Sequence, residues 1–281
     1  MDSHVRSRTR NGTVSADRIR RPNVARSVVA LFALCAATIT ATGEQPSRAT
    51  SKSSPGSDAA QPTSASAGTL VEGVASYNYL CFLPKDYARQ PKLWPLIIFL
   101  HGRCEDEDLE KLKHFGPIKF ALAHDDFPFI VVAPATSRGW SVRLLGSFLD
   151  RIQTRFSVDR DRVYLTGLSM GGHATWALAT FSPNRFAAIA PVAGAGNPRL
   201  AAQRLRHLPA WIFHGEKDTI VPVKCGLMMI EALKAGGAEV KSTIYPDRGH
   251  DSWDPAYDNR DLYAWFLKHR RYQGQPTRRS P

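Results

Sequence analysis

The sequence predicts an α/β protein built on a mostly parallel, twisted sheet with helices on both faces. Two observations carry this prediction. Short, continuous apolar runs, typical of strands buried on both sides, alternate with helical segments over roughly the last two hundred residues. Between two of these runs, apolar residues recur at the spacing of an amphipathic helix, at Leu145, Phe148, Leu149, Ile152 and Phe156. A segment of this length can bury a substantial core, so we expect one folded domain over residues 69–272.

The elements of this domain are expected to alternate along the chain. Strands are expected at 96–100, 127–133, 163–165, 186–192, 211–213 and 240–245. The apolar segment 262–267 is expected to form a terminal helix whose aromatic side chains pack in the core. No long insertion separates the sheet elements, so we predict no large lid.

The first 68 residues differ from the rest in composition. Residues 1–43 contain seven arginines followed by the apolar run 27–40, which is short for a bilayer-spanning helix and typical of a signal peptide. We therefore expect export to the periplasm, the cell surface or the medium, with an uncleaved membrane anchor as the alternative. Residues 44–68 are rich in Ser, Ala, Thr and Pro and should form a disordered linker. Residues 273–281 should form a disordered basic tail.

The formal net charge of +12 does not indicate nucleic-acid binding. The first 43 residues hold +5 of it and the tail +2, and the linker is neutral, so the expected domain carries only +5. That domain contains no run of Lys and Arg interleaved with aromatic residues, so we expect no nucleic-acid partner.

Four cysteines and nine histidines show no spacing typical of a zinc site, so we expect neither a metal nor another cofactor. Cys35 would leave with the signal peptide, and Cys81, Cys104 and Cys225 would remain. Two alternatives remain for these cysteines: a disulfide bond between Cys104 and Cys225, or free buried thiols.

The segment 167–172, Gly-Leu-Ser-Met-Gly-Gly, lies between an expected strand and a helix-prone segment. A serine in such a tight turn adopts a strained backbone conformation that exposes its hydroxyl, and the flanking glycines avoid collisions with the strand and helix. The alternative is that Ser169 only caps a helix at a glycine-rich turn. The functional interpretation makes Ser169 a nucleophile.

A serine nucleophile needs a base and a carboxylate that orients the base. Asp218 follows the expected strand 211–213, and His250 lies in the last loop before the terminal helix. Glu216 and Asp251 compete for the acid role, but Asp251 is adjacent to His250 and would point away from it. We therefore predict Ser169, Asp218 and His250 as a catalytic triad.

Acyl transfer also needs N–H groups that stabilise the oxyanion formed when a carbonyl is attacked. The Met170 amide follows the nucleophile, and the Arg103 amide lies in the loop after the strand 96–100. We assign the oxyanion site to these two amides. Candidate residues for a substrate cleft are His101, Trp140 and Trp253.

Strand-His-Gly at 101–102, the serine turn at 167–172, Phe-His-Gly-Glu-Lys-Asp at 213–218 and Gly-His-Asp-Ser-Trp at 249–253 together resemble the α/β-hydrolase superfamily. Within it, the chain is similar to small esterases related to dienelactone hydrolases, phospholipase/carboxylesterases and the catalytic domain of prolyl oligopeptidases, with polyhydroxybutyrate depolymerases and feruloyl esterases as cousins. The resemblance covers about 69–272 and implies a three-layer α/β-hydrolase fold. The chain departs from it at 103–104, where relatives often have a small residue and a glycine.

The resemblance implies that esters are hydrolysed through an acyl-enzyme, without a metal or organic cofactor. The substrate would be a small-molecule ester or an ester linked to a polysaccharide. One alternative is a serine peptidase of the prolyl-oligopeptidase type. Another is a non-catalytic exported binding module on the same fold, although such a module has no reason to keep all three triad residues.

Overall fold

The computed structural model describes residues 69–74, 76–103 and 107–271. The expected signal peptide, linker and basic tail lie outside these residues, as does Cys104. None of the helices within these ranges has both the length and the hydrophobicity that spanning a bilayer requires.

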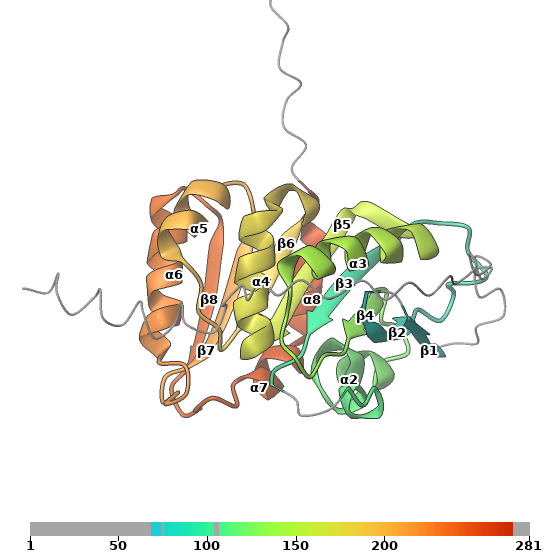
Figure 1. The fold of residues 1–281 in the computed structure, drawn as a ribbon, viewed down its shortest axis with the longest axis horizontal. Coiled ribbons are helices and arrows are strands. Elements are labelled where there is room, and N and C mark those ends of the chain that lie inside the picture. The colour runs from blue at the N-terminus through green and yellow to red at the C-terminus, as the bar shows by residue number, and fades with distance from the viewer. Residues whose placement is uncertain (1–68, 75, 104–106, 272–281) are drawn as a thin grey trace, which may run out of the picture. The chain divides into compact units, whose positions relative to one another are not determined.

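The described domain is built on one eight-stranded sheet with the order β1-β2-β4-β3-β5-β6-β7-β8 (Figure 1). From β4 to β8 all neighbouring strands are parallel, whereas β1 pairs with β2 and β2 with β4 in antiparallel fashion. The strands are β1 (Thr69–Val74), β2 (Asn78–Leu83), β3 (Trp94–Leu100), β4 (Ile130–Pro134), β5 (Val158–Leu168), β6 (Ala188–Val192), β7 (Ala210–Gly215) and β8 (Val240–Tyr245).

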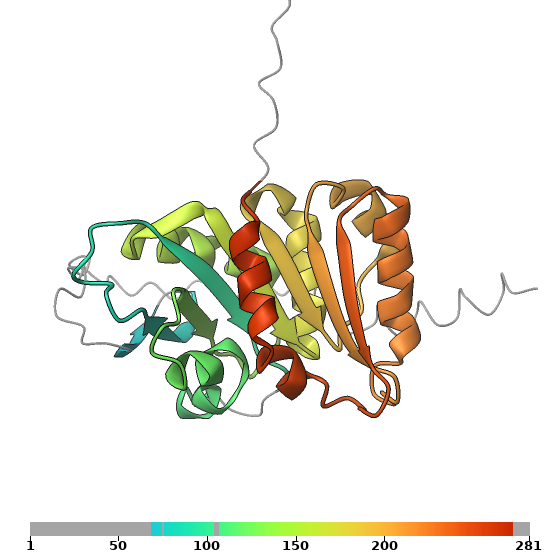
Figure 2. The ribbon, with the colours of Figure 1, turned by 180° about the vertical axis from the view of Figure 1, so that it is seen from behind.

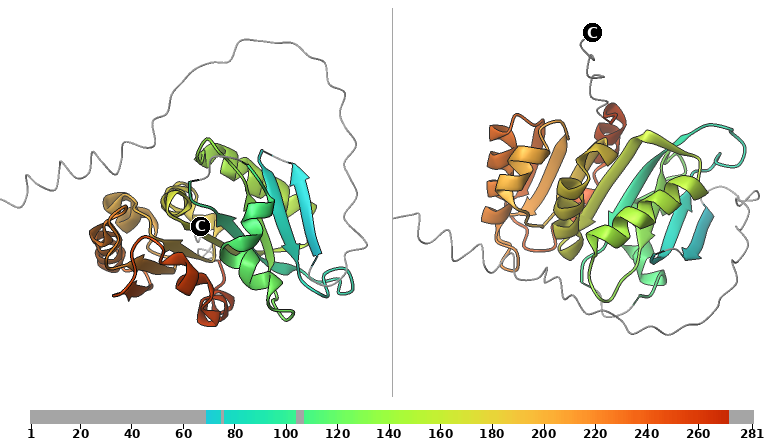
Figure 3. Two further views of the ribbon diagram at one scale, coloured as in Figure 1. Left: turned by 90° about the horizontal axis from the view of Figure 1, so that it is seen from below. Right: turned by 45° about the horizontal axis from the view of Figure 1, so that its top comes forward.

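Helices cover both faces of the sheet. Helices α3, α4, α5 and α6 lie on the face seen in Figure 1, and α8 lies on the face seen in Figure 2; both layers are visible in Figure 3. The helices are η1 (Glu110–His114), α2 (Gly116–Leu122), α3 (Val142–Arg155), α4 (Met170–Phe181), η2 (Pro183–Arg185), α5 (Pro198–Arg204), α6 (Val223–Ala235), α7 (Trp253–Tyr257) and α8 (Arg260–Lys268). The predicted mostly parallel sheet with helices on both faces is confirmed.

The two faces of the sheet bury separate hydrophobic cores. In β3, Leu96 and Ile98 face the core under α3, α4, α5 and α6, whereas Ile97 and Phe99 face the core under α2, α7 and α8. Successive side chains of a strand point to opposite faces, so a strand buried on both sides must be apolar throughout. All seven residues of β3 are buried, as this requires.

Several strand limits differ from those expected. The strand expected at 127–133 begins only at Ile130, because Phe127 is buried by ring contacts with Phe120 and Tyr263 instead of by strand pairing. Similarly, the strand expected at 186–192 begins at Ala188. The antiparallel strands β1 and β2 were not anticipated.

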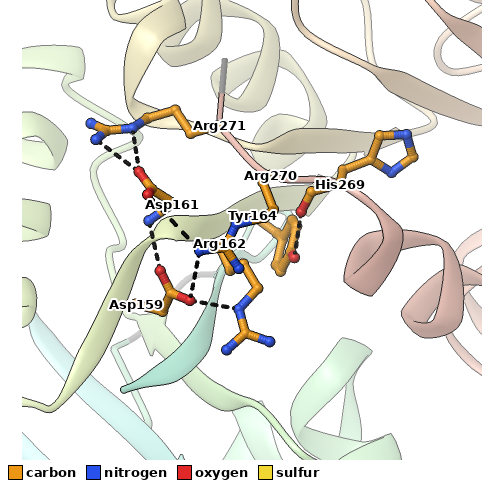
Figure 4. A network of polar contacts seen from close by, with 7 residues as sticks. All are labelled: Asp159, Asp161, Arg162, Tyr164, His269, Arg270 and Arg271. Carbon is orange, nitrogen blue, oxygen red and sulfur yellow. Dashed lines mark hydrogen bonds and ion pairs between the residues drawn. The ribbon is translucent and has the colours of Figure 1, made fainter. Parts of the chain in front are cut away.

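Strand β5 extends further toward the N-terminus than expected, because Asp159 and Asp161 have partners in the segment after α8 (Figure 4). Asp159 accepts a hydrogen bond from the Arg162 side chain (2.7 Å) and lies 3.4 Å from the Arg270 guanidinium. Arg271 donates to Asp161 from its side chain (2.9 Å) and from its backbone N–H (2.7 Å). These contacts fasten the segment after α8 to the start of β5, at the opposite end of the strand from Ser169.

The strand order places a candidate site at one point of the sheet. From β3 the chain passes to β4 on one side and then to β5 on the other, so the order reverses at β3. Open α/β sheets bind ligands at such a switch point, at the carboxyl ends of the strands. Leu100 and Gly167 are paired in register near the ends of β3 and β5, so the loop beginning at His101 and the turn at Ser169 adjoin there.

Candidate active site

Ser169 connects β5 to α4 in a strained backbone conformation. Its φ is +53° and its ψ is −115°, a backbone region that residues other than glycine rarely adopt. The turn is tight because a Cβ at Gly171 would overlap the carbonyl oxygen of Leu100, and a Cβ at Gly167 would lie 2.5 Å from the Gly171 carbonyl oxygen. The predicted strand, turn and helix are therefore present, and the two glycines are required by close backbone approach.

The structure brings the three predicted triad side chains together. Nε2 of His250 is 2.8 Å from Oγ of Ser169, and Nδ1 of His250 is 2.8 Å from Oδ2 of Asp218. In the neutral ring, Nδ1–H donates to the carboxylate, which leaves Nε2 as the acceptor of the serine proton. The Asp218 side chain is fully buried, and that of His250 is 19% exposed.

The loop after β7 holds the carboxylate of Asp218 in place. Oδ1 accepts hydrogen bonds from the backbone N–H groups of Ile220 (2.9 Å) and Val221 (2.8 Å). The competing carboxylates lie elsewhere: Glu216 is exposed, and Asp251 is exposed with a carboxylate oxygen 3.6 Å from the Arg248 guanidinium. Of the three acids considered, Asp218 is the one that contacts His250.

The two segments assigned to the oxyanion site adjoin Ser169. Met170 is the first residue of α4, where helix N–H groups have no intrahelical partner and the helix dipole favours negative charge. A Cβ at Gly102 would lie 3.5 Å from Cβ of Ser169, so the loop after β3 passes directly beside the serine. Arg103 follows in this loop with an exposed side chain.

His101 is enclosed by this loop and by the segment after β4. Its Nδ1 lies 2.6 Å from the Gly102 carbonyl oxygen, and its Nε2 accepts from the backbone N–H of Thr136 (3.1 Å). The ring therefore carries its proton on Nδ1, and burial lowers its pKa. Trp140 contacts the ring edge-on and donates from Nε1 to the His101 carbonyl oxygen (3.2 Å).

The three predicted cleft residues thus lie near the triad in different ways. His101 is only 6% exposed, and both of its ring nitrogens have partners. Trp140 is half-buried against it. Trp253 is half-buried, and its ring meets the His250 ring edge-on with centroids 5.5 Å apart. We infer that His101 stabilises the conformation of the loop after β3. Contact between the substrate and Trp140 or Trp253 stays a prediction.

Two further histidines adjoin the triad, and neither of them was predicted from the sequence to take part in the site. His173, one turn into α4, has Nδ1 2.7 Å from the Ser169 carbonyl oxygen. His214, at the end of β7, has Nε2 2.7 Å from the Val221 carbonyl oxygen and 3.4 Å from Oδ2 of Asp218. Burial lowers the pKa of both rings. One sequence signal could have drawn attention to His214: a strand followed by His-Gly occurs twice, at 101–102 and at 214–215.

Among the described residues, no group of three or more His, Cys, Asp or Glu side chains is placed to hold a metal ion. Cys81 is buried in β2 and Cys225 is buried in α6. The bridge between Cys104 and Cys225 stays a prediction, because Cys104 lies outside the described residues.

Comparison with known proteins gives consistent matches. The family model "Dienelactone hydrolase family" matches residues 70–260. A bifunctional acetylxylan esterase/xylanase of Neocallimastix patriciarum is 26% identical over 202 residues, which are 64% of this chain and 28% of that protein. A probable feruloyl esterase C of Aspergillus niger is 24% identical over 205 residues, or 66% of this chain and 72% of that protein.

The crystal structure of a thermostable esterase aligns with a TM-score of 0.60 and 26% identity, covering 72% of this chain and 63% of that one. This likeness confirms the predicted fold. The chain spans less than a third of the length of the bifunctional enzyme and less than two thirds of the thermostable esterase.

Proposed function

This chain belongs to the dienelactone hydrolase family, and from that premise we propose that it is an exported serine hydrolase that cleaves carboxylic esters through an acyl-enzyme. The observation that carries the proposal is the hydrogen-bonded series from Ser169 Oγ through His250 to Asp218, with both distances at 2.8 Å. A serine hydroxyl is a weak nucleophile at neutral pH, and this arrangement supplies the base and the carboxylate that it needs.

In the first half of the reaction, Ser169 Oγ attacks the ester carbonyl carbon while His250 Nε2 takes the serine proton. The carbonyl oxygen becomes an oxyanion, which the N–H groups of Met170 and Arg103 stabilise. His250 then gives the proton to the alcohol oxygen as its bond to carbon breaks. Asp218 stabilises the imidazolium throughout.

In the second half, water attacks the acyl-serine and loses a proton to His250. The bond from carbon to Ser169 Oγ breaks, the serine recovers that proton, and the carboxylic acid leaves. No group beyond the protein and water is needed to balance either half.

The substrate is proposed to be a small-molecule ester or an ester linked to a polysaccharide. Two relatives carry names that specify acetylxylan and feruloyl esters, and the leader at 1–43 supports action outside the cytoplasm. Peptide-bond hydrolysis is less favoured, because an amide leaving group demands more of the general acid than an ester leaving group does. The test below therefore includes an amide substrate.

The test is hydrolysis of p-nitrophenyl acetate, butyrate and octanoate by the full chain, beside a prolyl p-nitroanilide. Ser169→Ala should lower kcat at least about 10³-fold. Ser147→Ala, which alters an exposed serine of α3, is the matched control and should retain full activity. Ester hydrolysis that persists in Ser169→Ala would refute the proposal, and cleavage of the anilide alone would favour a peptidase.

Export is tested separately, by sequencing the N-terminus of the protein recovered from the medium or periplasm. Cleavage near residues 41–44 is the expected result. Retention of the intact leader in a membrane fraction would favour the anchor instead.

A further inference from the structure

His214 is a buried imidazole that contacts the triad at the Asp218 carboxylate. It belongs to β7, and its side chain is fully buried. Nε2 lies 2.7 Å from the Val221 carbonyl oxygen and 3.4 Å from Oδ2 of Asp218. Because both neighbours are acceptors, the proton of the neutral ring must be on Nε2.

Within the described part of the chain, the other ring nitrogen of His214 has no hydrogen-bond partner. Nδ1 is buried without a hydrogen bond, and it faces α6, where a Cβ at Gly226 would lie 2.7 Å from it. A buried acceptor without a partner costs about 1–3 kcal/mol. An apolar side chain would pack at this position without that cost, so packing alone does not account for a histidine here.

The Nε2–H group of His214 instead completes the surroundings of the Asp218 carboxylate. Two backbone N–H groups, those of Ile220 and Val221, fix Oδ1. Oδ2 faces two imidazoles: His250 at 2.8 Å and His214 at 3.4 Å. The His214 bond to the Val221 carbonyl oxygen also closes the loop that carries Asp218 back onto the end of β7.

We propose that His214 is a positioning residue, which aims Oδ2 of Asp218 at His250 by donating from Nε2–H to the Val221 carbonyl oxygen and toward Oδ2. The inference rests on the proposed function, in which Asp218 orients His250. His214 itself touches neither substrate nor Ser169. Its effect passes through Asp218 alone, and this dependence can be tested.

The test compares His214→Leu with His214→Gln. Leucine fills a similar volume without a donor, whereas the glutamine amide places an N–H near the position of Nε2. We expect kcat for p-nitrophenyl butyrate to fall about 10- to 100-fold in His214→Leu, because a misaimed triad loses its near-attack geometry. KM should change less than about threefold, since no substrate contact is lost. His214→Gln should recover most of the lost kcat.

A double-mutant cycle separates positioning from general damage to the fold. In an Asp218→Asn background the carboxylate is already absent, so His214→Leu should lower kcat further by less than about twofold. A merely structural role would lower kcat by the same factor in both backgrounds. That result, or a His214→Leu enzyme with unchanged kcat, would overturn the inference.

A readout without substrate keeps this inference distinct from the proposed function. The proton shared between His250 Nδ1 and Asp218 should give a downfield proton NMR signal, identified by its absence in His250→Gln. This signal should persist in His214→Gln and be lost or exchange faster with water in His214→Leu. If the wild-type chain hydrolyses no ester, the proposed function fails, whereas an unchanged signal in His214→Leu refutes the positioning role alone.

Discussion

The variants Ser169→Gly and Ser169→Ala form a matched pair that measures the backbone strain at the turn between β5 and α4. With φ at +53° and ψ at −115°, a side chain at this position costs about 1–3 kcal/mol. Both variants lose the hydrogen bond to His250, so that loss cancels in the comparison. Alanine keeps the strain, whereas glycine has no Cβ and relieves it. Glycine in turn destabilises the fold by about 0.4–1 kcal/mol through its more flexible unfolded chain.

The strain that glycine relieves exceeds the entropic cost of its more flexible unfolded chain. We therefore expect Ser169→Gly to be more stable than Ser169→Ala by about 1 kcal/mol. Urea unfolding of the two proteins, followed by circular dichroism, measures this difference directly. At an unstrained position the order is reversed, since glycine is ordinarily less stable than alanine by about 0.5–1 kcal/mol. An alanine variant that is equal to or more stable than the glycine variant would therefore refute the strain argument. Both variants should be inactive toward p-nitrophenyl esters.

Three further predictions concern the acid, the buried histidines and the end of the chain. Asp218→Asn preserves shape but no longer holds His250 in the required tautomer, so kcat for p-nitrophenyl butyrate should fall about 10³- to 10⁴-fold with little change in KM; a loss below tenfold would contradict the role given to Asp218. Burial lowers the pKa of His101 and His214, so in the folded protein these rings stay neutral where the unfolded chain takes up protons. The free energy of unfolding should therefore decrease as pH falls below about 6.5, by up to about 1.4 kcal/mol per pH unit for each ring, and a flat pH dependence in urea unfolding would exclude this. Asp159→Asn should lower the free energy of unfolding by about 1 kcal/mol, because it removes the carboxylate shared by Arg162 and Arg270. Its kcat should equal that of the wild type, since the network lies at the far end of β5 from Ser169.

The sequence was sufficient to place the serine turn, because every feature of that turn is local. The glycines, the preceding apolar strand and the following helix all lie within a few residues of Ser169. The order of the strands and of their loops then predicted that Asp218 and His250 would meet the serine at the same edge of the sheet. The structure brings these side chains together, as their positions after parallel strands require.

What the sequence could not show depends on partners that are distant in the chain. Asp159 and Asp161 resemble loop residues, and only their contacts with Arg270 and Arg271, after α8, explain why they belong to β5. Phe127 resembles a strand residue, but rings of α2 and α8 bury it in a loop. Hydrophobic pattern alone does not distinguish burial by a helix from burial within a sheet.

The same limit applies to the buried histidines. A histidine at the end of an apolar run is most simply interpreted as packing, so the sequence alone assigns no functional role to His214. Its functional contacts are made with Val221 and Asp218, inside a loop whose conformation the sequence does not specify. His101 is analogous, because its partner Thr136 follows a different strand.

The distances within the triad are ultimately set by backbone packing between loops. A Cβ at Gly215 would lie 2.6 Å from the Arg248 carbonyl oxygen, and the Lys217 N–H donates to that same oxygen at 2.9 Å. The loop of Asp218 and the loop of His250 are therefore joined through main-chain atoms, just as Gly171 joins the serine turn to the end of β3. Side-chain bonds such as that of His214 then only need to orient groups that the backbone has already brought within reach. This division explains why a positioning residue should affect kcat strongly and stability little.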